Sequence, residues 1–407
     1  YTAKLEESQI YSKLEIRLFA VLFEFHNRLT NIKKEEIMKR KLVQLLAGTL
    51  ALGILLTACG SSAAGESGVQ QSQNGEEPLK VLVLIPGTRG DMSVNDLAAR
   101  GLEKYAEDTG CEVKVFETGD LAGDFAKYES VYRDAFEEDW DLIFTNSKST
   151  RDILYKILPE YPDVRLIAYD DELDFESNSL PNAISVTYKQ NECSFLAGAL
   201  AAKMSETGIL GVVGCLESPV IHDFMYGFVQ GAQYADPDIK VLNSTVGSAT
   251  DALKAKELAI AQIKQGADVL YPPAANGVIG VLEAGAAEGV YVIGVDSDRA
   301  TSLKESNPEI AEIIPTSAVK NVSESLYRLT EDFSAGNLEF GQHLNLGIKE
   351  EGVGLVENEY YQKLVPEDVR AYIDETAGKI ASGEIEVETA LYMTAEEIEA
   401  IKESVRP

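Results

Sequence analysis

The 407-residue sequence has few residues that could bind a metal ion or form disulfide bridges. It holds three histidines, and the two after residue 58, His222 and His343, are far apart in the chain. Of its four cysteines, three follow Cys59, an odd number without the regular spacing of a disulfide framework. These three are Cys111, Cys193 and Cys215, which we interpret as small buried residues. The sequence therefore predicts no metal site and no disulfide framework.

Basic residues are also scarce. The chain has 36 Lys and Arg against 67 Asp and Glu, a formal net charge of −31. Such a surface repels a phosphate backbone, so nucleic acid is excluded as a partner. The sequence also lacks a glycine-rich phosphate loop that ends in Lys-Ser or Lys-Thr. With no activated nucleophile or metal site in view either, we predict a protein that is not an enzyme and needs no cofactor.

Near the N-terminus lies the pattern of a bacterial export signal. Basic residues 39–41 precede 17 uncharged, mostly apolar residues, 42–58. The run ends in Leu56-Thr57-Ala58-Cys59, which matches the lipobox of bacterial lipoproteins. A transmembrane helix is the alternative, but a span needs about 20 apolar residues. We predict a signal peptide over 38–58, lipidation of Cys59, and an anchor on the extracytoplasmic face of the cell membrane.

The segments on either side of this signal are not predicted to fold. Residues 1–37 do not begin with Met, and residues 33–37 imply purine-rich codons just before the codon of Met38, as in a ribosome-binding site. We interpret 1–37 as an upstream extension that is not native; a genuine cytoplasmic extension is the alternative. Residues 59–78 are rich in Gly, Ser, Gln and Glu, which is typical of a flexible tether.

From residue 79 the sequence alternates short apolar runs with amphipathic segments of helical period. This pattern is typical of a parallel sheet covered by helices on both faces. The predicted strands are 80–85, 112–116, 141–144, 164–169, 183–186, 209–213, 240–243, 268–271 and 290–295. The predicted helices are 94–109, 124–138, 150–161, 192–206, 221–235, 252–265 and 278–288. The alternation of strands and helices begins again after residue 186, which predicts two doubly wound α/β domains in tandem.

Polar residues follow these strands, where ligands of doubly wound sheets bind. The loops are rich in Asp, Asn and Ser and poor in basic groups, which suits a polyhydroxyl ligand because carboxylates and amides accept hydrogen bonds from hydroxyls. Capping of the next helix is the alternative role for any one of them. The candidates in these loops are Asp91, Ser93, Asn95, Asn146, Ser147, Asp170, Asn276, Gly277 and Asp296.

Several motifs of the sequence belong together: 90–96, 195–202, 219–231 and 289–298, with 365–369 and 379–385 near the end. Together they resemble the basic membrane protein family, the substrate-binding lipoproteins of ABC transporters that include purine nucleoside receptors. The resemblance implies the type I periplasmic binding fold, two lobes joined by three crossovers that close on a ligand. It places one lobe at 79–185 and 316–345 and the other at 186–315 and 346–407. ABC permease and ATPase subunits are the implied partners of a monomer.

The resemblance also implies which side chains hold the ligand. Asp296 matches the position that binds ribose hydroxyls, and Lys320 matches a lysine beside the sugar, which we expect to open a helix and to face Asp296 across the hinge. Phe224 is a candidate to stack on a base; core packing beside Gly227 is the alternative. Two stacking positions of the family differ here, with Val94 in one and Asn146 in the other.

A purine nucleoside is the ligand that this resemblance favours. Another nucleoside, a sugar and a signalling molecule are the alternatives. A lipoprotein that senses a ligand and presents its bound form to a receptor would have the same sequence features as a transport protein.

Overall fold

The structure is a computed structural model that describes residues 78–90, 94–119, 121 and 123–407. The predicted signal peptide, the lipidation site Cys59 and the tether up to residue 77 lie outside the described residues. Among the described residues, no helix combines the length and apolar character needed to cross a membrane.

The first sheet has six parallel strands in the order β12-β5-β4-β3-β1-β2. Their bounds are β1 Lys80–Ile85, β2 Glu112–Glu117, β3 Leu142–Thr145, β4 Leu166–Tyr169, β5 Ala183–Tyr188 and β12 Gln342–Leu346. Strands β1, β3, β4 and β5 are buried along almost their whole length, because helices cover both faces of the sheet. The edge strand β2 instead alternates exposed and half-buried residues.

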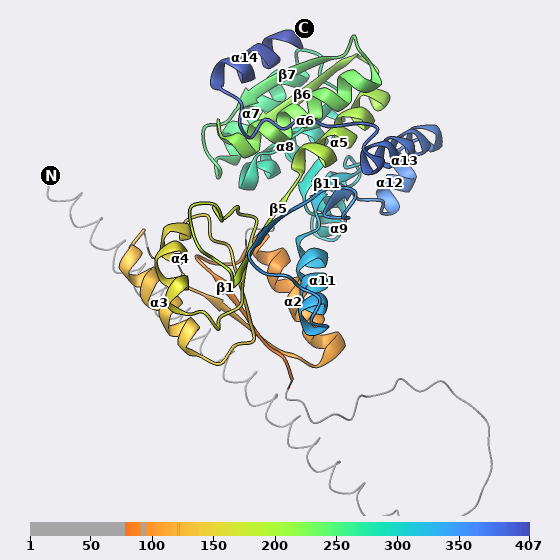
Figure 1. Ribbon diagram of the computed structural model, residues 1–407. Helices are drawn as coiled ribbons and strands as arrows, with labels where there is room; N and C mark the ends of the chain where they lie inside the picture. The colour runs from red at the N-terminus through yellow and green to blue at the C-terminus, as the bar shows by residue number, and fades with distance from the viewer. Residues whose placement is uncertain (1–77, 91–93, 120, 122) are drawn as a thin grey trace, which may run out of the picture. The chain divides into compact units, whose positions relative to one another are not determined.

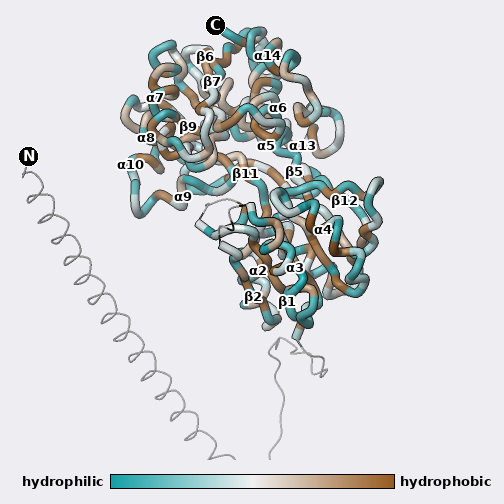
Figure 2. The backbone as a smooth tube through the Cα atoms, turned by 90° about the vertical axis from the view of Figure 1, so that its left-hand side faces the viewer, coloured by the Kyte–Doolittle hydropathy of each residue, from teal (hydrophilic) through white to brown (hydrophobic). Residues whose placement is uncertain are grey.

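Helices α3 (Phe125–Glu137) and α4 (Arg151–Ile157) lie on one face of this sheet, and α2 (Val94–Thr109) and α11 (Val322–Ser334) on the other (Figure 1). The tube in Figure 2 alternates between apolar and polar colours along α2, α3 and α4, as expected for helices with one face on a sheet. Helices α2 and α11 approach closely, since a Cβ at Gly101 would lie 2.3 Å from the carbonyl oxygen of Ser323.

The second sheet has four parallel strands in the order β7-β6-β8-β9. Its strands are β6 Ile209–Gly214, β7 Lys240–Thr245, β8 Val269–Tyr271 and β9 Tyr291–Val292. Its helices are α5 Gln190–Met204, α6 Pro219–Ala235, α7 Ala252–Ile263 and α8 Val278–Glu288. Glycines bring α5 and α6 together backbone to backbone: a Cβ would lie 1.9 Å from Phe228 O at Gly198 and 1.8 Å from Phe195 O at Gly231. The 195–202 and 219–231 motifs therefore encode this close helix pair.

A third sheet joins the two halves. It consists of β10 (Gly294–Asp296), β11 (Ser317–Lys320) and β13 (Val353–Leu355), with β10 and β11 parallel. The single strand predicted over 290–295 is wrong, because the chain changes sheets within it. Ile293 N donates to Leu270 O at 2.9 Å, whereas Gly294 N donates to Thr316 O at 2.9 Å. Ile293 is thus bonded to the second sheet, whereas Gly294 already belongs to the third.

The chain passes between the halves three times: from β5 to α5, from β11 to α11 and from β12 to β13. Residues 316–345, which the sequence assigns to the first lobe, begin with β11, which pairs with strands of the second. The lobe boundaries themselves remain a prediction.

Shorter helices and the C-terminal helices complete the fold. They are η2 Leu158–Glu160, η3 Ala275–Gly277, α9 Arg299–Leu303, α10 Pro308–Ala311, α12 Glu359–Leu364, α13 Glu367–Ser382 and α14 Ala395–Ser404. The helix predicted over 150–161 is divided: α4 ends at Ile157, and a 3₁₀ turn with Pro159 near its start follows. Proline has no backbone N–H to continue the helical hydrogen bonds, which explains the early end.

Candidate functional site

A pocket of about 220 Å³ lies where strands β4, β10 and β11 end. Its apolar lining comprises Val94, Val220, Ile221, Phe224, Pro272, Pro273, Ala275, Val278 and Val295. Its charged lining comprises Lys148, Asp170, Asp296, Arg299 and Lys320. Apolar walls with a few convergent polar groups are typical of small-molecule sites.

Asp170, directly after β4, is the centre of the charged group. One carboxylate oxygen accepts from Lys320 Nζ at 2.8 Å and the other from Lys148 Nζ at 2.5 Å. Burial alone would raise the pKa of Asp170, but the two lysines outweigh burial and lower this pKa from 3.8 to about 2. Asp170 is therefore an ionised, buried carboxylate that joins the β3 and β4 loops to strand β11.

Lys320 is the last residue of β11, so the expectation that it opens a helix is wrong. It also does not face Asp296 from the far side of a hinge, because β10 and β11 are neighbours and Asp296 is in register with Val319. Burial acts to lower the pKa of Lys320, yet the carboxylates of Asp170 and Asp296 raise it above its usual value. The Lys320 ammonium group is thus held as a cation between two carboxylates.

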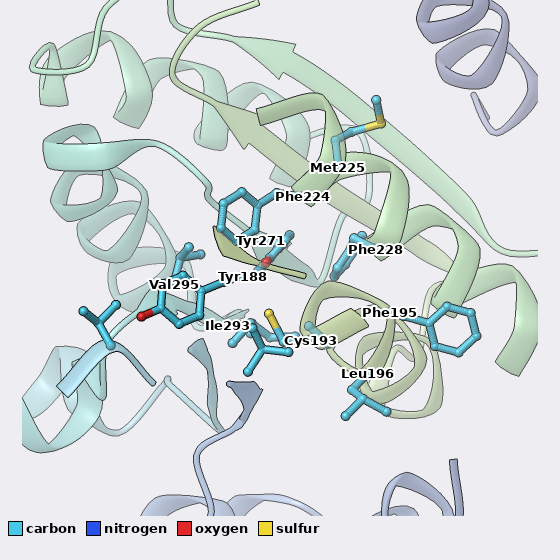
Figure 3. Packing of buried hydrophobic residues seen from close by; sticks show 14 of the residues in the cluster. Tyr188, Cys193, Phe195, Leu196, Phe224, Met225, Phe228, Tyr271, Ile293 and Val295 are labelled. Carbon is cyan, nitrogen blue, oxygen red and sulfur yellow. The ribbon is translucent and has the colours of Figure 1, made fainter. Parts of the chain in front are cut away.

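Phe224 forms the apolar wall next to this cation. Its ring comes from the first turns of α6, and Lys320 Nζ lies 5.5 Å from the ring centroid, within cation–π distance. The residue is only 4% exposed and belongs to the core that Figure 3 shows, where Met225 points away from it. Deeper in this core, Phe228 stacks on Tyr271 with centroids 4.8 Å apart. Phe224 therefore both packs in the core and lines the pocket.

Three pocket residues have left-handed backbone conformations. The φ angles of Asp170, Ala275 and Asp296 are 53°, 49° and 68°, respectively. Residues other than glycine rarely adopt positive φ, and such positions cluster at functional sites. Because Asp170 and Asp296 turn sharply where their strands end, their carboxylates lie beside the pocket rather than along the sheet.

A second hollow of about 470 Å³ shares Asp296 and Lys320 with the pocket. The side chains around it are mostly polar and include Arg100, Ser297, Thr301, Asn321 and Ser323. A ligand held by Asp296 and Lys320 would therefore have apolar surface on one side and hydrophilic surface on the other.

The structure places the predicted site residues in three groups. The first group, Asp170, Phe224, Asp296 and Lys320, lines the pocket. The second group lies outside the described residues and consists of Asp91 and Ser93. The third group, Asn95, Asn146, Ser147, Asn276 and Gly277, is described but does not line the pocket.

Some residues of this third group have other contacts. Asn95 accepts from the Tyr169 hydroxyl at 3.3 Å. Ser147 is fully buried and donates to Asp171 at 2.5 Å. Asn276 is exposed, and its N–H donates to the carbonyl of Ala249 at 3.0 Å. These residues shape the loops around the pocket in this structure.

The expectation that the strand-end loops are poor in basic groups is wrong for the pocket itself. Lys148 and Arg299 join Lys320 there, so cations outnumber the carboxylates of Asp170 and Asp296. Arg299 is buried and donates through Nε to Val295 O at 3.0 Å. For Lys148 the only sequence signal is its place after the predicted strand 141–144.

The pocket can donate and accept hydrogen bonds at fixed positions. Lysine and arginine supply donors only, and ionised aspartates supply acceptors only. Within the part of the chain that the structure describes, no cluster of His, Cys, Asp and Glu could hold a metal ion. The arrangement thus suits a ligand that carries hydroxyl groups beside an apolar, flat portion.

Comparison with known protein families gives a match over most of the chain. Residues 79–390 match the family model described as ABC transporter substrate-binding protein PnrA-like. The chain is 30% identical over 336 residues to "Basic membrane protein A2" of Borrelia garinii subsp. bavariensis, covering 82% of this chain and 92% of that protein. It is 26% identical over 359 residues to the "CD4+ T-cell-stimulating antigen" of Listeria monocytogenes, covering 86% and 98%.

Solved structures agree with these matches. An ABC transporter solute-binding protein from Aeropyrum pernix K1 has a TM-score of 0.65 at 26% identity, covering 81% of this chain and 100% of that chain. A "transcriptional activator of comK gene" from Bacillus halodurans has a TM-score of 0.64 at 25% identity, covering 75% and 99%. This likeness confirms the predicted α/β fold of two doubly wound lobes with three crossovers.

Proposed function

The chain belongs to the PnrA-like, or basic membrane protein, family of ABC transporter substrate-binding proteins, and from this membership we propose that it binds a purine nucleoside for an ABC importer. Its fold is that of type I periplasmic binding proteins. In this proposal the chain binds its ligand without chemical turnover and delivers it to permease and ATPase subunits. It is anchored through lipidated Cys59 on the extracytoplasmic face of the cell membrane.

The observation that supports the choice of ligand is that Phe224 lies next to the charged residues of the pocket. Asp296 accepts hydrogen bonds from sugar hydroxyls, and Lys320 donates to a hydroxyl or ring oxygen. The ring of Phe224 and the apolar residues Val94 and Ile221 contact the base. Stacking of a base on an aromatic side chain is worth about 1–3 kcal/mol, so a nucleoside gains affinity that neither half gains alone.

Calorimetry tests this choice with inosine, adenosine, uridine, hypoxanthine and ribose. We expect a purine nucleoside to bind at least about tenfold more tightly than the free base or the sugar, because a charge-assisted hydrogen bond contributes about 1.5–3 kcal/mol. Asp296→Asn should weaken binding of the nucleoside by a similar factor. The surface variant Asp108→Asn serves as a control, because Asp108 pairs with Lys104 on the exposed face of α2. If ribose or the free base bound as tightly as the nucleoside, the choice of ligand would be wrong.

A second candidate function is a ligand-sensing lipoprotein that presents its bound form to a receptor. The observation in its favour is the likeness to the Bacillus halodurans protein named as a transcriptional activator. Crosslinking of the ligand-bound lipoprotein in its native membrane separates the two. Recovery of an ABC permease supports import, and recovery of a signalling receptor without a permease supports sensing.

A further inference from the structure

Residues 383–405, here called the C-terminal strap, run over helices α5 and α6 of the second half. Asn191 Nδ2, in the first turn of α5, donates to Val387 O at 3.0 Å. Gln230 of α6 exchanges two hydrogen bonds with the main chain of Glu388, at 2.9 and 3.0 Å. Helix α6 is also the element that supplies Val220, Ile221 and Phe224 to the pocket.

An inner anchor of the strap is Asp223, the residue before Phe224. Its carboxylate is 1% exposed and accepts from Thr389 Oγ1 and Ala390 N, each at 2.7 Å, and from Gln190 Nε2 at 2.5 Å. Two of these three donors belong to the strap. A buried carboxylate needs such partners, so the strap and the pocket-lining turn of α6 are held together.

An outer anchor lies just before α6, at Glu217. Its carboxylate accepts from Lys402 Nζ of α14 at 3.0 Å, from His222 Nε2 at 2.7 Å and from Thr245 Oγ1. Burial raises the pKa of Glu217, but these donors outweigh it and lower the pKa to about 2. One carboxylate thus connects the last helix, strand β7 and the first turn of α6.

Helix α14 is itself firmly placed. Thr394 and Glu397 form a capping box at its start, Ile398 is 2% exposed, and Val405 O accepts from Val241 N of β7 at 2.8 Å. Figure 1 shows α14 beside β7. A hollow of only about 20 Å³ separates Lys402 from Ile221, which also lines the ligand pocket. Little empty space therefore lies between α14 and the first turn of α6.

We propose that the C-terminal strap is a positioning element of the ligand pocket, in which Lys402 acts through Glu217 to hold Val220, Ile221 and Phe224 in place. The strap does not touch the ligand. Helix α14 begins at residue 395, after the stretch 79–390 that the family model matches. The inference rests on the proposed function only in taking the pocket as the ligand site.

Hydrogen exchange measured by mass spectrometry on the full mature chain tests the mechanical part without any ligand. In Lys402→Met we expect amides of residues 222–226 to exchange about two- to fivefold faster than in the wild type, the scale of one exposed ion pair. Lys402→Arg, which keeps the ion pair, should restore the wild-type rate. Lys256→Met is the matched control, because it removes another cross-helix ion pair of the same half, Lys256–Glu283 at 2.9 Å.

Binding of inosine tests the effect on the pocket. We expect Lys402→Met and Glu217→Gln each to weaken inosine binding at least about two- to fivefold. The double variant should bind inosine no more weakly than Glu217→Gln alone, because the charge that pairs with Lys402 is already lost there. Unchanged exchange at 222–226, or faster exchange with unchanged inosine affinity, would overturn the inference. If the wild type fails to bind inosine, the choice of nucleoside is wrong, and the exchange measurement alone then decides on the strap.

Discussion

The ion pair of Asp170 and Lys320 gives the most direct test of the site. Lys320→Met would remove one of the two cations on a carboxylate that is 7% exposed. Pairing lowers the pKa of Asp170 from 3.8 to about 2, which corresponds to about 2 kcal/mol of folded-state stability. Loss of one partner of a buried pair typically costs about 3–5 kcal/mol. Because Lys148 remains, we expect a loss of about 3 kcal/mol, at the lower end of this range.

The pH dependence of this contribution follows from the direction of the shift. A carboxyl whose folded pKa is depressed stabilises the folded state above its unfolded pKa and loses this effect as pH falls through the folded pKa. The unfolding free energy of wild type minus that of Asp170→Asn should therefore be constant above about pH 5 and should shrink between about pH 4 and about pH 2. Taking the difference removes the contribution of the other carboxylates.

Urea denaturation measures both the loss of stability and its pH dependence. Unfolding is monitored by circular dichroism and by the fluorescence of Trp140, the single tryptophan of the chain. The double variant Asp170→Asn/Lys320→Met should lose less than the sum of the single variants by about 2 kcal/mol, because it leaves no unpaired buried charge. Strictly additive losses, or a difference that does not change with pH, would refute the reasoning. Lys256→Met, which breaks a surface pair, should change stability by less than about 1 kcal/mol.

Three further changes test other parts of the structure. Phe224→Ala should weaken inosine binding by about tenfold but leave ribose binding almost unchanged, since only the base stacks on the ring. Calorimetry that showed equal losses of affinity for both ligands would contradict this. Gly198→Ala places a Cβ 1.9 Å from Phe228 O and should cost several kcal/mol in urea denaturation, whereas Gly378→Ala, with open space around it, should gain up to about 1 kcal/mol. Burial raises the pKa of Asp223, so ionisation of this carboxyl lowers the stability of the folded state as pH rises above the ordinary pKa of an aspartate. Asp223→Asn should therefore lose less stability than the wild type as pH rises above about pH 4; an equal loss would contradict this.

Most of the regular elements could be predicted because their signals are local. The strand over 80–85 and the helix over 94–109 begin and end where the sequence predicts them. The division of 290–295 could not be predicted, since both strands form one apolar run and their separation depends on partners in β8 and β11. Strand β11, which carries Lys320, is likewise specified by neighbours far away in the sequence.

The site is predictable where a strand end alone determines it. Asp170 and Asp296 follow from that rule, and both line the pocket. Asn276 obeys the same rule but lies exposed in a 3₁₀ turn and does not line the pocket. Lys148 could not be found in this way, since its role depends on reaching across to Asp170, a contact between two loops.

Two of the edge strands in the described sheets, β2 and β7, are protected from other chains by different means. An open strand edge offers unpaired N–H and C=O groups to a neighbouring molecule and invites aggregation. Strand β2 presents the charged side chains of Glu112 and Lys114 to solvent, whereas β7 has its edge at Val241 covered by the carbonyl of Val405. We therefore expect removal of residues 395–407 to make the protein prone to self-association through β7, which size-exclusion chromatography over a range of concentrations would detect. An affinity tag for purification is for the same reason better placed at the N-terminal side of residue 78 than directly after Pro407.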